Sequence, residues 1–128
     1  MPLEQQGTVK EEERYDKGLA IQDPIYGNEI KEKMKDLPGD LGNIVPKFLT
    51  EECFGDFYTR GGLDIKTGEL LVLCVLTALG AEKQIYSHAQ GNIKVGNSKE
   101  TQITAIIHCI PYIGFPQSIN AINIIKSI

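Results

Sequence analysis

The chain has 128 residues, 41% hydrophobic and 23% charged, a composition that can fill one compact core and excludes a disordered tail. The formal net charge at pH 7 is −4. Residues 1–50 carry 7 basic and 10 acidic side chains, and residues 51–128 carry 6 and 7. Because nucleic-acid binding depends on neutralising phosphates, the lack of a basic excess predicts no DNA or RNA partner.

The three cysteines, Cys53, Cys74 and Cys109, are widely spaced and form no C-x-x-C motif. This spacing predicts no metal site, and it is typical of thiols in a reducing cytoplasm. The acidic N-terminal region does not have the pattern of a secretory signal. Residues 101–125 contain no Asp, Glu, Lys or Arg, but the prolines, glutamines and asparagines there are costly in lipid. We therefore expect buried helices there and no membrane span.

The spacing of apolar residues predicts an all-α fold of six or seven helices, with residues 1–9 as a tail and 10–128 as one domain. In chain order the predicted helices are 10–22, 25–35, 42–58, 66–79, 82–95, 99–112 and 116–128. We expect Asp23-Pro24 to end or kink the first helix and Pro111 to kink the sixth. An apolar stripe is predicted along the third helix, formed by Ile44, Val45, Phe48, Leu49, Cys53, Phe54 and Phe57.

Caps and glycines delimit the later helices. Asp64 and Ser98 are predicted N-caps, and Gly80 is expected to end the helix that begins after Asp64. That helix is apolar almost all round, so we expect it to be the buried centre of the fold. Two uncharged stretches, 70–81 and 101–125, need cover on several sides, which favours a homo-oligomer. The alternative is a monomer with one very apolar central hairpin.

His88 and Glu69 are candidate acid–base residues. His88 shares a helix face with Gln84, and a neutral imidazole can move a proton near neutral pH. A lone helical histidine is also commonly a structural residue. Glu69 lies in the first turn of its helix, where the helix dipole alone would stabilise a carboxylate. If Glu69 points into the interior instead, burial would make it a usable acid or base.

Arg60 and Tyr112 are candidate binding residues. The guanidinium of Arg60 precedes a Gly-Gly turn and could bind a carboxylate through paired hydrogen bonds, or it could be an ordinary loop residue. Tyr112 could offer its hydroxyl to a pocket or belong to the core. His108 has no ligand-forming neighbour on its helix and is predicted to be structural.

The motif Phe54-Gly55-Asp56-Phe57-Tyr58-Thr59-Arg60-Gly61-Gly62-Leu63-Asp64 is followed by Glu69, His88, Gly96 and Tyr112-Ile113-Gly114-Phe115-Pro116. In this order and spacing, the chain from about residue 10 onward resembles the carboxymuconolactone decarboxylase family. The resemblance implies an alkyl hydroperoxidase D-like helical bundle that assembles into homotrimers or homohexamers.

One branch of that family decarboxylates 4-carboxymuconolactone without a cofactor. The resemblance to it implies a small carboxylate substrate, with His88 as acid or base, Arg60 as the carboxylate anchor, and Glu69 or Tyr112 nearby. It further implies that Gln84, Tyr112, Phe54 and Phe57 bind the substrate, and that neither a metal nor a cofactor takes part.

The other branch resembles alkyl hydroperoxidase D and uses a Glu, a Cys-x-x-Cys pair and a His. Registered on His88, its glutamate falls on Glu69, but its cysteines fall on Ala81 and Gln84. A peroxidase or disulfide reductase activity is therefore disfavoured, because these residues cannot form a disulfide. A non-catalytic oligomeric binding protein of the same fold remains a further alternative.

Overall fold

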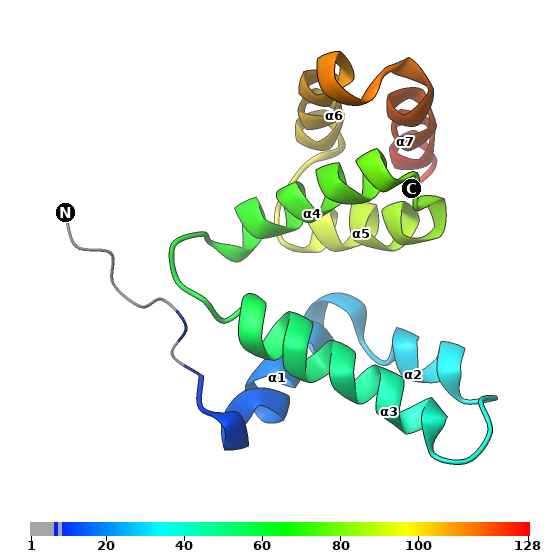
Figure 1. The fold of residues 1–128 in the computed structure, drawn as a ribbon. Helices are drawn as coiled ribbons and strands as arrows, with labels where there is room; N and C mark the ends of the chain where they lie inside the picture. Colours follow the sequence, from blue (N-terminus) through cyan, green and yellow to red (C-terminus); the bar gives the residue numbers. More distant parts are fainter. Residues whose placement is uncertain (1–6, 8) are drawn as a thin grey trace. The chain divides into compact units, whose positions relative to one another are not determined.

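The computed structural model describes residues 7 and 9–128, and within them every regular element is helical (Figure 1). The predicted all-α class is therefore confirmed, whereas most of the predicted tail, residues 1–9, lies outside the described residues. The elements are η1 (Glu11–Glu13), α1 (Arg14–Tyr26), α2 (Glu29–Met34), α3 (Leu41–Phe48), η2 (Leu49–Phe57), α4 (Ile65–Leu79), α5 (Glu82–Lys94), α6 (Lys99–Ile113) and α7 (Phe115–Ser127). None of these helices combines the length and apolar character that a bilayer crossing requires.

The chain divides into two compact units at the boundary between Leu63 and Asp64. The first unit contains α1, α2, α3 and η2, coloured blue to green in Figure 1, and the second contains α4 to α7. Each unit has its own packing and is described by itself.

In the first unit, α1 and η2 approach each other closely at two glycines. A Cβ atom on Gly18 would lie 2.8 Å from the backbone nitrogen of Gly55, and one on Gly55 would lie 2.5 Å from the carbonyl oxygen of Arg14. The same contact carries a two-pronged ion pair, in which Arg14 Nε and Nη2 donate to the Asp56 carboxylate at 2.9 and 2.8 Å. The two glycines therefore let the helix backbones touch, and the ion pair fixes their register.

The segment after α3 is a π-helix, η2, and not the continuous α-helix expected over 42–58. Its closing backbone bond runs from Tyr58 N to Cys53 O at 3.0 Å, five residues apart. This wider winding buries Thr50, Phe54 and Gly55, while Val45, Phe48 and Phe57 are exposed. The predicted apolar stripe is therefore not covered along its whole length: Val45 and Phe48 are exposed on the α-helical segment, and Phe57 on the π-helical one.

The first long helix continues through Asp23-Pro24, which we expected to end or kink it. It ends at Tyr26, followed by Gly27 at φ 57°, and the Gly27 N–H donates to Asp23 O at 2.9 Å. A positive φ is what glycine adopts without strain, so Gly27 ends the helix and Pro24 lies within its last turn. Likewise α6 runs through Pro111 to Ile113.

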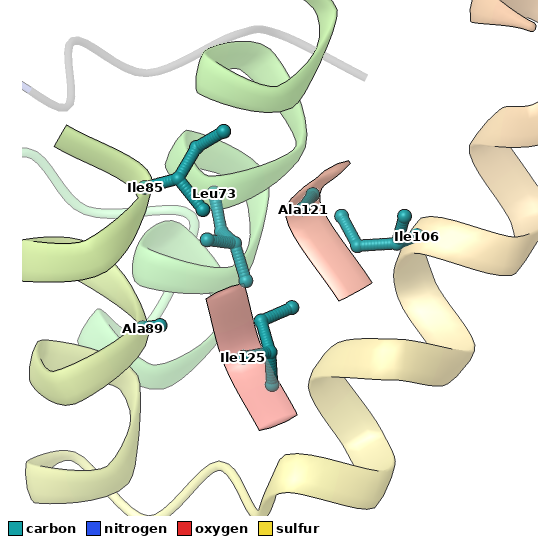
Figure 2. Packing of buried hydrophobic residues seen from close by; sticks show 6 residues of the cluster. All are labelled: Leu73, Ile85, Ala89, Ile106, Ala121 and Ile125. Atoms are coloured by element: carbon teal, nitrogen blue, oxygen red, sulfur yellow. The ribbon is translucent and has the colours of Figure 1, made fainter. Parts of the chain in front are cut away.

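In the second unit, four helices enclose one core of aliphatic side chains. Figure 2 shows its members pointing toward one another from all four helices: Leu73, Ile85, Ala89, Ile106, Ala121 and Ile125. The predicted caps that frame these helices are confirmed. Asp64 accepts from Thr67 N at 2.7 Å, Ser98 accepts from Thr101 N at 3.1 Å, and Gly80 ends α4 at φ 68°.

The prediction that α4 is buried all round is wrong on one side. Leu73, Thr77 and Glu69 are fully buried, but Val75 and Leu79 are 57% and 71% exposed. On α6 and α7 the uncharged stretch has an exposed side of the same kind, formed by Ile107, Tyr112, Phe115 and Ile119. The second unit thus has a filled core and, in addition, an apolar surface that its own four helices do not cover.

Replacing Gly18 with alanine is expected to lower the free energy of unfolding by about 1–3 kcal/mol, because the new methyl group would overlap the backbone of η2. Gly68→Ala is a matched control, since Gly68 is also helical and a Cβ there would meet no atom within 4 Å. That variant should be neutral or up to about 1 kcal/mol more stable. Urea denaturation followed by circular dichroism measures both. Equal stability of Gly18→Ala and wild type would contradict the close approach of α1 and η2.

Candidate active site

The centre of the candidate site is a contact between α4 and α5. His88 Nδ1 lies 3.1 Å from Glu69 Oε2. The Glu69 side chain has no solvent exposure, whereas the His88 side chain is 21% exposed. The sequence left two alternatives for Glu69, a carboxylate stabilised by the helix dipole or one that points into the interior, and the structure shows the second. The buried carboxyl group of Glu69 contacts the imidazole on the side of the ring that faces the interior.

This arrangement orients the imidazole for proton transfer. When Nδ1 donates its hydrogen to the Glu69 carboxylate, the lone pair of the neutral ring lies on Nε2. A carboxylate in this position also stabilises the ring when Nε2 takes up a proton. The pair can therefore accept a proton at Nε2 and return it, which is what general acid–base chemistry requires.

Three buried carboxamides form a hydrogen-bonded chain that reaches the backbone of the pair, and sequence reasoning did not identify them as site residues. They are Asn92, Asn97 and Gln102, all at most 3% exposed. Asn92 Nδ2 donates to the carbonyl oxygens of Glu69, at 3.1 Å, and His88, at 2.8 Å. The position of Asn92, four residues after His88 on one helix face, is the signal that could have pointed to it.

Two other predicted site residues belong to the same unit. Gln84 is exposed in the first turns of α5, four residues before His88. Tyr112 is 89% exposed near the end of α6 and lines an open groove of about 490 Å³ between α4 and α6, together with Cys74 and Cys109. Neither Tyr112 nor Gln84 belongs to the hydrophobic core.

The remaining predicted residues, Arg60, Phe54 and Phe57, belong to the first unit. Arg60 is exposed directly after η2, and Phe57 is 68% exposed. Phe54 is buried, with its ring 5.8 Å from that of Tyr26 and 4.7 Å from that of Tyr58. Within its unit Phe54 thus forms part of an aromatic cluster between α1 and η2.

The thiol positions of a peroxidase site hold no sulfur in this chain. Ala81 is the N-cap residue of α5 and Gln84 lies in that helix. The three cysteines, Cys53, Cys74 and Cys109, lie elsewhere and form no disulfide. Burial, together with a hydrogen bond to Cys109, raises the pKa of the Cys74 thiol to about 12.

Among residues 9–128, no group of three or more His, Cys, Asp and Glu side chains is arranged to bind a metal ion.

An all-helical fold is what the sequence resemblance implied. Residues 45–127 match the carboxymuconolactone decarboxylase family over more than half of the chain. The chain belongs to this family, and its fold is the alkyl hydroperoxidase D-like helical fold.

Two curated relatives are decarboxylases by name. A 4-carboxymuconolactone decarboxylase from Acinetobacter baylyi is 28% identical over 124 residues, which cover 94% of this chain and 90% of the relative. The nitrosuccinic acid decarboxylase npaB from Metarhizium robertsii is 27% identical over 113 residues, covering 84% of this chain and 75% of the relative.

Alkylation of Cys74 by iodoacetamide at pH 8.5 is expected to be roughly a thousandfold slower in the folded protein than in urea, because a pKa raised from 9.0 to about 12 leaves that much less thiolate. The rate should rise with pH up to about pH 12. Mass spectrometry of the Cys74 peptide over time measures the rate. Equal rates in folded and unfolded protein would show that the thiolate is available.

Proposed function

We propose that this protein is a cofactor-independent carboxy-lyase that acts on a small carboxylated lactone or a related acid. The observation that carries the proposal is the contact of a partly exposed His88 ring with the fully buried Glu69 carboxyl group. The names of the two relatives, both decarboxylases, support the same reaction class.

The acids in the names of the two relatives, 4-carboxymuconolactone and nitrosuccinic acid, have one chemical property in common, and this property defines the proposed substrate class. Loss of carbon dioxide from a carboxymuconolactone leaves a dienolate-like charge that spreads onto the lactone oxygen. Loss of carbon dioxide from the nitro-bearing carbon of nitrosuccinic acid leaves a charge that spreads onto the nitro oxygens. In both cases the electrons of the broken C–C bond need no cofactor to receive them. The class is therefore an acid whose departing carboxylate is attached to a carbon conjugated with an oxygen acceptor.

In the proposed reaction, the bond between the substrate carbon and its carboxylate breaks, and the electron pair stays on the substrate. His88, protonated on both nitrogens, then delivers the Nε2 proton to carbon, while its Nδ1–H remains bonded to Glu69. The ring leaves this step neutral and regains a proton from solvent. One proton is consumed for each carbon dioxide released, so the atoms and charges balance.

Arg60 is proposed to hold a carboxylate of the substrate, because an exposed guanidinium binds carboxylates through two parallel hydrogen bonds. Gln84 is proposed to contact the substrate from the His88 face of α5. Tyr112, Phe54 and Phe57 complete the set of proposed substrate-binding residues, as the family resemblance implies.

The protein is further proposed to act as a homotrimer or homohexamer in the cytoplasm. The support for assembly is the apolar surface on the second unit, where Val75 on α4 and Ile107 on α6 are more than half exposed. Contiguous apolar surface of this kind typically marks an interface. Three free cysteines agree with a reducing compartment.

Release of carbon dioxide from 4-carboxymuconolactone and from nitrosuccinate tests the proposed activity. We expect turnover of at least one of the two acids without added metal or cofactor. His88→Asn should lower kcat by about a hundred- to ten-thousandfold, because the proton donor is lost. Glu69→Gln should lower kcat less, and Arg60→Gln should mainly raise KM.

His108→Asn is the matched control, since His108 is the other histidine of the chain and lies exposed on α6. Its kcat should equal that of wild type. The proposal would be overturned if neither acid were decarboxylated, or if His88→Asn and His108→Asn were equally active.

Val75→Asp places a charge on the exposed apolar side of α4 and is expected to convert the oligomer to a monomer. Light scattering coupled to size-exclusion chromatography measures the mass. Lys83→Asp is a control, because Lys83 is exposed in the polar first turn of α5 and the variant should keep the wild-type mass. A monomeric wild-type protein would contradict the proposed assembly.

A further inference from the structure

The Asn92 side chain contacts the backbone of both members of the Glu–His pair, because Nδ2 donates to the carbonyl oxygens of Glu69 and His88 at 3.1 and 2.8 Å. It is fully buried. The carbonyl oxygens of Glu69 and His88 lie inside helices, where each already accepts a backbone N–H from the next turn. The carboxamide of Asn92 is therefore not needed to satisfy them. What it adds is a cross-link between α4 and α5 at the two residues whose side chains meet.

The oxygen of the Asn92 carboxamide is itself hydrogen-bonded, to a second buried carboxamide. Asn97 Nδ2 donates to Asn92 Oδ1 and to Lys66 O, both at 2.8 Å. Gln102 Nε2 donates in turn to Asn97 O and to Ala89 O, both at 3.2 Å. The three carboxamides thus form a continuous chain from α6, across the end of α5, to α4. Because each is buried and its donors are engaged, rotation of any one of them would break at least one bond.

We infer that Asn92 is a positioning residue for the Glu69–His88 pair, a role that rests on the proposed function, and that Asn97 and Gln102 hold Asn92 in place. Catalytic side chains must keep their geometry to within about 0.5 Å, and neighbouring hydrogen bonds supply that rigidity. The hydrogen bond between His88 and Glu69 joins two separate helices, so a small slide of α5 along α4 would lengthen it. Asn92 opposes such a slide because it is bonded to both helices at the same level.

The test uses the 128-residue chain labelled with ¹⁵N-histidine. The sequence contains two histidines, His88 and His108, so each imidazole signal can be assigned. In wild type, the Nδ1 hydrogen of His88 should exchange slowly with water, because Glu69 holds it in the interior. The exposed His108 is an internal reference for fast exchange. Asn92→Leu keeps a side chain of similar size and removes the bond to Glu69 O on α4 together with the bond to His88 O on its own helix. We expect it to speed exchange of the His88 Nδ1 hydrogen at least about tenfold and to lower kcat by about ten- to a hundredfold, with KM changed less than twofold.

Gln22→Leu is the matched control. Gln22 is a buried carboxamide of the first unit that accepts a hydrogen bond from Thr50 Oγ1 at 2.6 Å. The Gln22→Leu variant should lose stability as Asn92→Leu does, yet change neither the His88 exchange rate nor kcat.

If Asn92→Leu does not fold, Asn97→Ala is the second variant. It removes only the hydrogen bonds that Asn97 donates to Asn92 and to Lys66 O, so a smaller change in the exchange rate and in kcat is expected, in the same direction.

The exchange measurement needs no substrate, so it separates the two proposals. If wild type decarboxylates neither acid but Asn92→Leu still speeds exchange at His88, the proposed function fails and the positioning of the pair stands. If the variants leave both the exchange rate and kcat at the wild-type values, Asn92 is a structural residue only and the inference is overturned.

Discussion

The hydrogen bond between His88 and Glu69 is the interaction on which the proposed chemistry of this protein depends. A carboxyl group without solvent exposure is costly in a protein interior unless a partner stabilises it, and here the partner is an imidazole that reaches the surface. The cost of burial is offset by the contact, and the contact in turn fixes the orientation of the ring. Three nearby features place the two helices that carry the bond. The Asp64 cap begins α4, Gly80 ends α4 so that α5 can pack against it, and Asn92 links α5 to α4.

The two units use different means of packing. In the first, two glycines bring helix backbones into contact, and the Arg14–Asp56 ion pair sets their register. In the second, aliphatic side chains from four helices fill the core, and the buried polar residues include three carboxamides with hydrogen-bonded donors. The second unit therefore combines a conventional core with a rigid polar layer next to the Glu–His pair. Such a layer gives directional bonds that an aliphatic contact cannot give.

The sequence alone predicted the helical class, the last four helices and their caps at Asp64 and Ser98, because these depend on local spacing and on side chains that bond to nearby backbone. It identified His88 and Glu69, but it could not choose between a dipole-stabilised and a buried Glu69, since that depends on where α5 packs. The end of the first helix was misplaced because proline is tolerated within its last turn, at Pro24. The Asn92 cross-link was missed because its partner on α4 is a backbone atom, the carbonyl oxygen of Glu69, and only the four-residue spacing from His88 along α5 pointed to Asn92.

The π-helical winding of η2 has a consequence for how the chain tolerates changes in length. Thr50 and Gly55 lie five residues apart, a spacing that shares one face in π-helical winding but not in α-helical winding. A residue inserted or deleted between them would therefore need a compensating change of winding to keep both against α1, where the helix backbones approach closely. The exposed turn around Gly39, by contrast, can gain or lose residues at little cost. Insertions and deletions among natural variants should therefore gather near Gly39 and be absent from η2.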